Sequence, residues 1–353
     1  MFNFKKTAKD VRDIIVVGAS AGGVEALKAF VKGLPKDFKG SVFIVLHIPS
    51  YSETRLPWIL SKAGPLEAVL PSDGDEIEPG KIYVAPNDHH LLLQEESRMV
   101  VRRGPKENRF RPSIDALFRS AAYIYRSRVI GVILSGLLDD GASGLWTIQQ
   151  QGGIVVVQTP EDAEQPQLPQ NVLQYVKPDY KVPAADMGPL ISGLVKQPAP
   201  SKHKFSEEEL KRLKTEVIIA TRDNAFEMGI MDMGKLTPFT CPGCAGALVR
   251  LVEGDILRYR CHTGHAYTAS SLAAEVTESV EGFLWRAIRG LEETNMLMNN
   301  IADHYEELAN SKGSSIFRQK AKDAADHAAE IHNLVLNHDQ FSEDVRLDKK
   351  AHK

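Results

Sequence analysis

The chain has 353 residues, of which 43% are hydrophobic and 25% are charged, and its formal net charge is −3 at pH 7. This length allows two or more domains with separate cores, and the near-neutral charge argues against a polycation that binds nucleic acid. No apolar run reaches the length of a membrane span, and no secretory signal is evident at the N-terminus. We therefore expect a cytoplasmic protein that does not insert into membranes.

A serine follows the first apolar run. Residues 13–17 are strand-like and lead into Gly18-Ala-Ser20-Ala-Gly22, which fits the G-x-S-x-G pattern of a nucleophile presented on a sharp strand-to-helix turn. We expect a helix over 24–31, whose first amides would favour negative charge developing near the Ser20 hydroxyl. The alternative is a glycine-rich turn that binds phosphate. The segment has neither a Walker lysine nor the G-x-G-x-x-G spacing, and both absences argue against this alternative.

A histidine ends the second apolar run. Residues 41–46 are wholly apolar after Ser41 and lead into His47, and Pro49 then stops the strand. A lone histidine at a strand end is usually structural. Because His47 is expected at the same sheet edge as an elbow serine, it is a candidate general base.

Two aspartates follow the third apolar run. Residues 129–134 continue through a serine and a glycine to Asp139 and Asp140. Either carboxylate could orient an imidazole and stabilise its cation, and either could instead cap the helix expected to follow. The residues alone leave this choice open. The order Ser, His, Asp differs from the Ser, Asp, His order of α/β-hydrolases, which argues against that fold.

Further strands are expected at 81–85 and 153–158, and a helix at 113–125. Buried Val/Ile/Leu strands that alternate with helices predict a doubly wound, mainly parallel, Rossmann-like α/β domain over residues 1–196. Ligands of such sheets bind outside the carboxyl ends of the strands, so the serine, the histidine and an aspartate are expected to form one site. Residues 197–236 read as a linker and a short helix that opens with a capping box at Ser206.

A cysteine/histidine unit is expected over residues 237–270. Cys241-x-x-Cys244 and Cys261 are separated by an alternating segment around Gly254 that predicts a hairpin, as in a zinc ribbon. The fourth ligand would be His262 or His265. We favour His265, because a glycine precedes it and its spacing from Cys261 suits a knuckle. Four protein ligands would make the zinc ion structural rather than catalytic.

The remainder is expected to be helical. Residues 271–340 predict an antiparallel helical hairpin, and 341–353 a flexible tail. The long apolar seams of the hairpin suggest that two copies of the chain form a homodimer through it. The expected first seam consists of Val280, Leu284, Ala287, Leu291, Thr294, Met298, Ile301, Tyr305 and Leu308. The expected second seam consists of Phe317, Ala321, Ala324, Ala328, Ile331, Val335 and His338.

Residues 13–193 resemble the catalytic domain of the chemotaxis protein-glutamate methylesterase (CheB) family. The resemblance lies in five ordered segments, at 17–23, 46–49, 82–89, 108–115 and 131–142. It implies a triad of Ser20, His47 and Asp140, which would settle the choice between the aspartates. It also implies oxyanion contacts near Ala21 and Leu137. Alanine at position 21 replaces the threonine usual in enteric-type enzymes, but a backbone amide remains there.

The resemblance further implies hydrolysis of glutamate γ-methyl esters on a methylated chemoreceptor-like protein, or deamidation of glutamine. A companion methyltransferase would be a partner. Because the resemblance begins near the N-terminus, we expect a stand-alone form without a receiver domain. Nucleic acid is not an expected partner, although Arg250, Arg258 and Arg260 lie in the ribbon-like unit. A competing hypothesis is a non-catalytic signalling adaptor that retains an esterase fold.

Overall fold

The computed structural model describes residues 11–48, 54–200, 205–221 and 225–337. The chain divides into two compact units, Met1–Ser271 and Leu272–Lys353. The features expected at Pro49, in part of the 197–236 linker, at His338 and in the tail at 341–353 lie outside the described residues.

The first unit contains a seven-stranded sheet in which every pairing is parallel. The strand order β3-β4-β2-β1-β7-β8-β9 reverses direction between β1 and β7. All residues of β1, β2, β7 and β8 are buried, which explains their continuous apolar runs. This confirms the predicted fold class. The strands are β1 (Ile14–Ala19), β2 (Ser41–Leu46), β3 (Glu67–Val69), β4 (Lys81–Val84), β7 (Val129–Ile133), β8 (Ile154–Gln158) and β9 (Tyr180–Val182).

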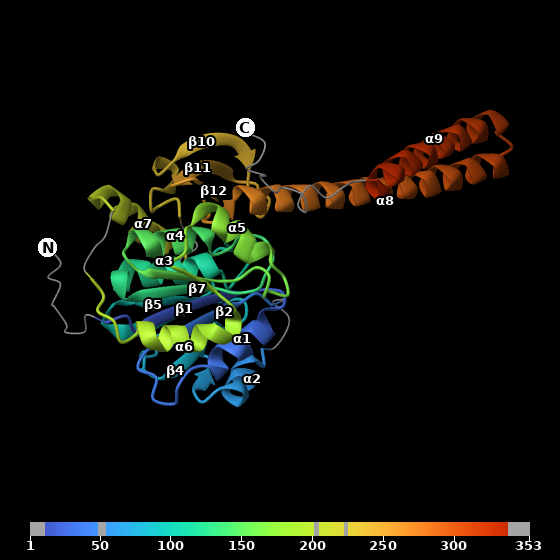
Figure 1. Cartoon of the computed structure of the whole chain (residues 1–353). Helices are drawn as coiled ribbons and strands as arrows, with labels where there is room; N and C mark the ends of the chain where they lie inside the picture. The colour runs from blue at the N-terminus through green and yellow to red at the C-terminus, as the bar shows by residue number, and fades with distance from the viewer. Residues whose placement is uncertain (1–10, 49–53, 201–204, 222–224, 338–353) are drawn as a thin grey trace, which may run out of the picture. The chain divides into compact units, whose positions relative to one another are not determined.

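Helices cover both faces of this sheet (Figure 1). One face packs on α1 (Gly23–Lys32), α2 (Leu56–Ala63) and α6 (Ala184–Leu194). The other face packs on α3 (Ile114–Tyr125), α4 (Ala142–Gln150) and α5 (Gln167–Tyr175). Alternate residues of β1 enter the two cores, since Ile15 and Val17 face the first group and Ile14 and Val16 the second. A hairpin of β5 (His90–Gln94) and β6 (Arg98–Arg102) packs beside α3. Short 3-10 turns lie at Glu95–Ser97, Arg126–Arg128 and Ile230–Asp232.

The predicted capping box and ribbon hairpin are both present. Ser206 caps α7 (Glu207–Ile219), and Glu209 completes the box. The ribbon is a four-stranded antiparallel sheet in the order β10-β11-β12-β13, with Gly254 at the turn between β11 and β12. Its strands are β10 (Lys235–Thr240), β11 (Ala247–Glu253), β12 (Ile256–Cys261) and β13 (Ala266–Thr268).

The expected separate parts 1–196, 197–236 and 237–270 instead form one compact unit. Ile256 of β12 belongs to the same apolar core as α3 and α4. Arg258 and Arg260 of β12 form buried ion pairs with residues of α7 and of the segment before α3. Because Arg258 and Arg260 find buried partners across the expected boundaries, the ribbon and the seven-stranded sheet belong to one unit.

The second unit is an antiparallel pair of helices, as predicted, formed by α8 (Ala269–Glu307), which begins in the first unit, and α9 (Ser311–Leu336) (Figure 1). Asn295 donates to the Ala321 carbonyl at 2.7 Å, and Tyr305 stacks on Phe317. The second seam is buried at Ala321, Ala324 and Ala328 as expected.

The first seam was wrong at four of its nine positions, which include Val280 and Leu308. Ala287 and Thr294 are exposed, whereas Ile288 and Ala302 are buried. The alternation of four and three was correct, but a polar residue, Asn295, occupies the interface because its amide reaches the α9 backbone. Among the described residues, no helix is long and apolar enough to cross a membrane.

Candidate active site

Ser20 lies directly after β1, at the edge where the strand order reverses. Its amide donates to the Ser135 carbonyl at 2.9 Å, and the Gly23 amide, which begins α1, donates to the Ser20 carbonyl at 2.9 Å. The turn requires glycine at position 22, where φ is 70° and a Cβ would lie 2.7 Å from both Glu164 Cβ and Ser135 Oγ. Ser20 is therefore held on a tight turn that faces the N-terminus of α1.

His47 lies beside Ser20 because β1 and β2 are paired in register. Ala19 pairs with Leu46, and the His47 amide donates to the Ala19 carbonyl at 3.1 Å. The imidazole stacks on Phe110 with ring centroids 3.7 Å apart and an interplanar angle of 8°. Its Nε2 lies 2.9 Å from Asp140 Oδ2. Its Nδ1 is buried and has no hydrogen-bond partner among the described residues.

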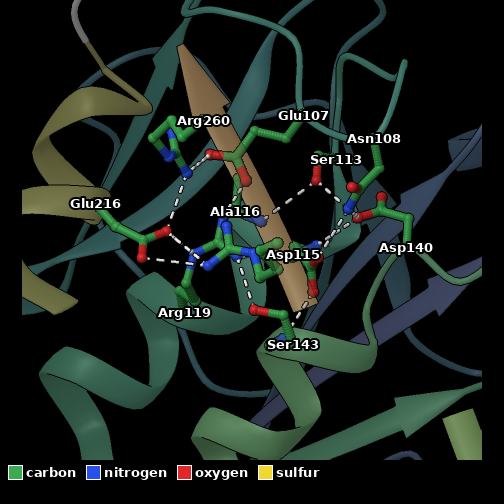
Figure 2. A network of polar contacts seen from close by, with 12 residues as sticks. Glu107, Asn108, Ser113, Asp115, Ala116, Arg119, Asp140, Ser143, Glu216 and Arg260 are labelled. Atoms are coloured by element: carbon green, nitrogen blue, oxygen red, sulfur yellow. Dashed lines mark hydrogen bonds and ion pairs between the residues drawn. The ribbon is translucent and has the colours of Figure 1, made fainter. Parts of the chain in front are cut away.

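Asp140 is fully buried against the N-terminus of α3 (Figure 2). Besides His47, it accepts hydrogen bonds from the Ile114 amide at 2.7 Å and from Asn108 Nδ2 at 2.8 Å. Ser113 Oγ and the Asp115 amide add bonds of 3.0 and 3.2 Å. Burial acts to raise the pKa of Asp140, but these donors and the His47 imidazole outweigh burial and lower it. The carboxylate is thus kept charged next to the imidazole.

Asp139 has different surroundings from Asp140. It accepts hydrogen bonds from Thr268 Oγ1 at 2.8 Å and from Ser270 Oγ. Burial raises the pKa of Asp139 in spite of these two hydroxyl groups. The structure therefore brings Asp140, and not Asp139, into contact with His47.

A third buried carboxyl group lies behind the site. Asp115 accepts the Gly144 amide at 2.6 Å and Asn108 Nδ2 at 2.8 Å. Burial, together with the charge of Asp140, raises the pKa of Asp115 to about 8. At neutral pH it is protonated, so it adds no second negative charge next to Asp140.

The sequence did not assign roles to Asn108, Phe110 or Ser113, although all three lie in one segment of the family resemblance. Asn108 adopts a left-handed backbone with φ of 50°, and Ser113 is the N-cap of α3. The sequence could have indicated the N-cap, because Ser113 stands at the start of the expected helix and serine is a preferred N-cap residue. Nothing in the sequence linked that cap to a carboxylate that follows β7.

The two residues expected near the oxyanion lie in the loops that flank Ser20. The Ala21 carbonyl accepts a hydrogen bond from Ser135 Oγ at 2.8 Å. Leu137 lies in the loop after β7, with its side chain 43% exposed. Gly136, which precedes Leu137, lies so close to Ser20 that a Cβ at position 136 would be 2.8 Å from Ser20 Cβ. Both loops therefore border the serine.

In the ribbon, the structure brings together Cys241, Cys244, Cys261 and His265, whose ligand atoms all lie within 4.8 Å of one another. Cys244 Sγ lies 3.6 Å from Cys261 Sγ, and His265 Nδ1 lies 3.6 Å from both Cys241 Sγ and Cys261 Sγ. Tetrahedral zinc with Zn–S bonds of about 2.3 Å requires sulfurs roughly 3.7 Å apart, so this donor set fits zinc. His262 is not in the group.

A buried cluster of charges joins the ribbon to α3 (Figure 2). In this cluster, guanidinium groups pair with carboxylates. Without these partners, burial would favour the uncharged form of each carboxyl group. Burial acts to raise the pKa of Glu107, but Arg119, Arg260 and Arg258 overcome that effect and lower it to about 2. The pairs are Arg119–Glu107, Arg260–Glu107, Arg260–Glu216, Arg258–Glu216 and Arg258–Glu253. Arg258 and Arg260 are therefore unavailable to nucleic acid.

A family model described as CheB methylesterase matches residues 15–191. A putative protein-glutamate methylesterase/protein-glutamine glutaminase of Leptospira interrogans is 38% identical over 168 residues, which cover 48% of this chain and 87% of that protein. A protein-glutamate methylesterase/protein-glutamine glutaminase of Thermotoga maritima is 34% identical over 178 residues, covering 48% of this chain and 52% of that protein. The crystal structure of the Thermotoga maritima CheB methylesterase catalytic domain has 32% identity and a TM-score of 0.50, and the match covers 52% of this chain and 98% of that one.

Proposed function

The chain belongs to the CheB methylesterase family, and on that premise we propose that it hydrolyses glutamate γ-methyl esters on a chemoreceptor-like protein. The observation that carries the proposal is that three groups follow neighbouring parallel strands at one sheet edge. Ser20 and His47 follow paired residues of β1 and β2, and Asp140 Oδ2 lies 2.9 Å from His47 Nε2. A nucleophile, a base and an orienting carboxylate at such a place are typical of acyl transfer through a covalent intermediate.

The hydrogen bonds of His47 define how the proton moves. Because Asp140 is an acceptor, Nε2 of the neutral imidazole carries the proton and Nδ1 holds the free electron pair. Among the residues that the structure describes, Nδ1 has no hydrogen-bond partner, so it is the nitrogen that takes the proton of the Ser20 hydroxyl. The serine oxygen then attacks the ester carbonyl, and the protonated imidazole returns the proton to the departing methanol.

Deacylation repeats the same steps with water. His47 Nδ1 removes a proton from water, the resulting hydroxide attacks the glutamyl-serine ester, and Ser20 recovers its proton. The backbone amides of Ala21 and Leu137 are proposed to hold the oxyanion in both halves, helped by the N-terminus of α1. Asp140 stabilises the imidazolium each time it forms, without taking up the proton itself.

A second activity, glutamine deamidation, is favoured by the names of the relatives, which are described as protein-glutamine glutaminases as well. The same acyl-enzyme would form, with ammonia leaving in place of methanol. The two activities differ in their released product. Incubating the full chain with methylated or glutamine-bearing receptor fragments, and measuring methanol and ammonia separately, distinguishes them.

Ser20→Ala tests the proposal directly. A fluorophosphonate should label the wild-type serine in the folded protein and fail to label Ser20→Ala, and methanol release should stop in the variant. If the folded wild type takes up no label and releases no methanol, the signalling adaptor is the better account. As further parts of the proposal, the protein acts in the cytoplasm, a companion methyltransferase forms the ester, and the α8–α9 hairpin joins two copies of the chain.

A further inference from the structure

The ribbon's candidate metal ligands are continuous with a strand that reaches the active site. The Cys261 amide donates to the His265 carbonyl and the Gly264 amide donates to the Cys261 carbonyl, both at 3.0 Å, which closes a turn between two ligands. β13 begins at the next residue, Ala266. A metal ion bound by Cys261 and His265 would hold the turn from which β13 emerges.

β13 binds the segment before α3 by backbone hydrogen bonds. The Ala266 amide donates to the Lys106 carbonyl at 3.2 Å, and the Asn108 amide donates to the Ala266 carbonyl at 2.8 Å. The other edge of β13 pairs with β12. The backbone of Asn108 is therefore placed by the strand that leaves the ligand turn.

Hydrogen bonds from the ribbon's end also orient the Asn108 side chain. Its Oδ1 accepts from the Thr268 amide at 2.8 Å and from Ser271 Oγ at 3.1 Å. Its Nδ2 therefore faces the carboxyl groups of Asp140 and Asp115, at 2.8 Å from each. The flipped amide would place its oxygen against these two carboxyl groups and its NH₂ against two donors, so only one orientation satisfies the site.

We propose that Cys241, Cys244, Cys261 and His265 bind a zinc ion, and that this ion positions the catalytic carboxylate through β13 and Asn108. The esterase activity then depends on whether the metal site is filled. The dependence of activity on zinc rests on the proposed esterase function, whereas the metal site and the contacts that position Asp140 stand on their own geometry. Thr263 Oγ1, 3.1 Å from Cys244 Sγ and 3.0 Å from Cys261 Sγ, supplies the outer contact expected of zinc thiolates.

The metal site is tested by zinc content. The full chain, purified without added chelator, should hold one zinc ion, measured by atomic spectrometry, and Cys241→Ser or Cys261→Ser should lower that content. His262→Ala is the matched control and should keep the zinc, because His262 is outside the group. Full chain that binds no zinc, even after dialysis against zinc chloride, would overturn the proposal.

The positioning role is tested by combining zinc removal with Asn108→Gly, which tolerates the positive φ and removes only the side chain. Losing a charge-assisted hydrogen bond lowers kcat by about 10- to 100-fold. We expect a loss of this size when a chelator strips zinc from the wild type, full recovery when zinc is restored, and no further loss when zinc is stripped from Asn108→Gly. Equal losses in both proteins would show that the ion does not act through Asn108.

Proton NMR separates this proposal from the esterase assignment. The imidazole proton between His47 Nε2 and Asp140 should give a low-field resonance that is lost on zinc removal and weakened in Asn108→Asp, where a carboxylate replaces the donor. Ser271→Ala keeps the Thr268 donor and should keep the resonance. A zinc-sensitive resonance in a protein without esterase activity would refute the proposed function and leave the positioning intact. A resonance unchanged by zinc removal would refute the positioning.

Discussion

Gly136→Ala should move the nucleophile without touching the triad chemistry. A Cβ at this position would lie 2.8 Å from Ser20 Cβ and 2.7 Å from Leu168 Cδ2, whereas ordinary contacts begin near 3.4 Å. The serine or the loop after β7 must therefore shift by about 0.6 Å. Because a misplacement of about 1 Å in a reacting group costs roughly 100-fold, we expect kcat/KM to fall by about 10- to 100-fold. Overpacking should also lower the free energy of unfolding by about 1–3 kcal/mol.

The matched control is Gly153→Ala, at the opposite end of the sheet, just before β8. There a Cβ would lie 2.6 Å from Ile148 Cγ2 and 2.7 Å from the Val129 carbonyl oxygen, so overpacking is similar but Ser20 is not involved. Urea denaturation gives the stability of both variants, and the rate of methanol release gives their activity. If Gly136→Ala is folded and as active as Gly153→Ala, the tight packing of Ser20 against the loop after β7 does not set the rate.

Asp140→Asn should lower kcat by about 10⁴-fold with little change in KM, because the amide no longer holds the His47 tautomer; a loss below tenfold would rule out Asp140 as the orienting group. Glu216→Gln should lower the free energy of unfolding by about 3–5 kcal/mol, since it leaves buried guanidinium groups underpaired, whereas the exposed control Glu208→Gln should change it by less than about 0.5 kcal/mol. The carboxyl pKa of Asp115 is raised from 3.8 to about 8, so its contribution to stability is complete below pH 3.8 and is lost as pH rises through about 8. Asp115→Asn should flatten that fall in urea titrations from pH 4 to 8, and an unchanged slope would contradict the assignment.

The parallel sheet was predictable because its strands are buried on both faces and so read as continuous apolar runs. The convergence of Ser20 and His47 followed from the same argument, since parallel strands end at one edge. The clustering of Cys241, Cys244, Cys261 and His265 followed from local spacing. In each case the residues that carry the pattern lie within one strand or one knuckle, where the backbone geometry fixes their spacing.

Contacts between distant segments were not predictable. Asn108 reaches Asp140 from 32 residues away and Thr268 from 160 residues away, and its sequence neighbours give no sign of either partner. The buried arginines of β12 alternate along a strand as solvent-facing residues would. The hairpin seam failed at Ala287 for a related reason, since apolar residues at both 287 and 288 fit a helical repeat and only the partner helix selects one.

The buried ion pairs between β12, α7 and α3 make the ribbon inseparable from the esterase. The segment that the family model matches ends at residue 191, but Glu107 and Arg119 within it find part of their charge partners at Arg260 and Glu216. Cutting the chain after that segment would remove partners from charges that are buried in the intact protein. The ribbon and the sheet therefore depend on each other for these charge pairs, and a fragment that ends at residue 191 should be less stable than the intact chain.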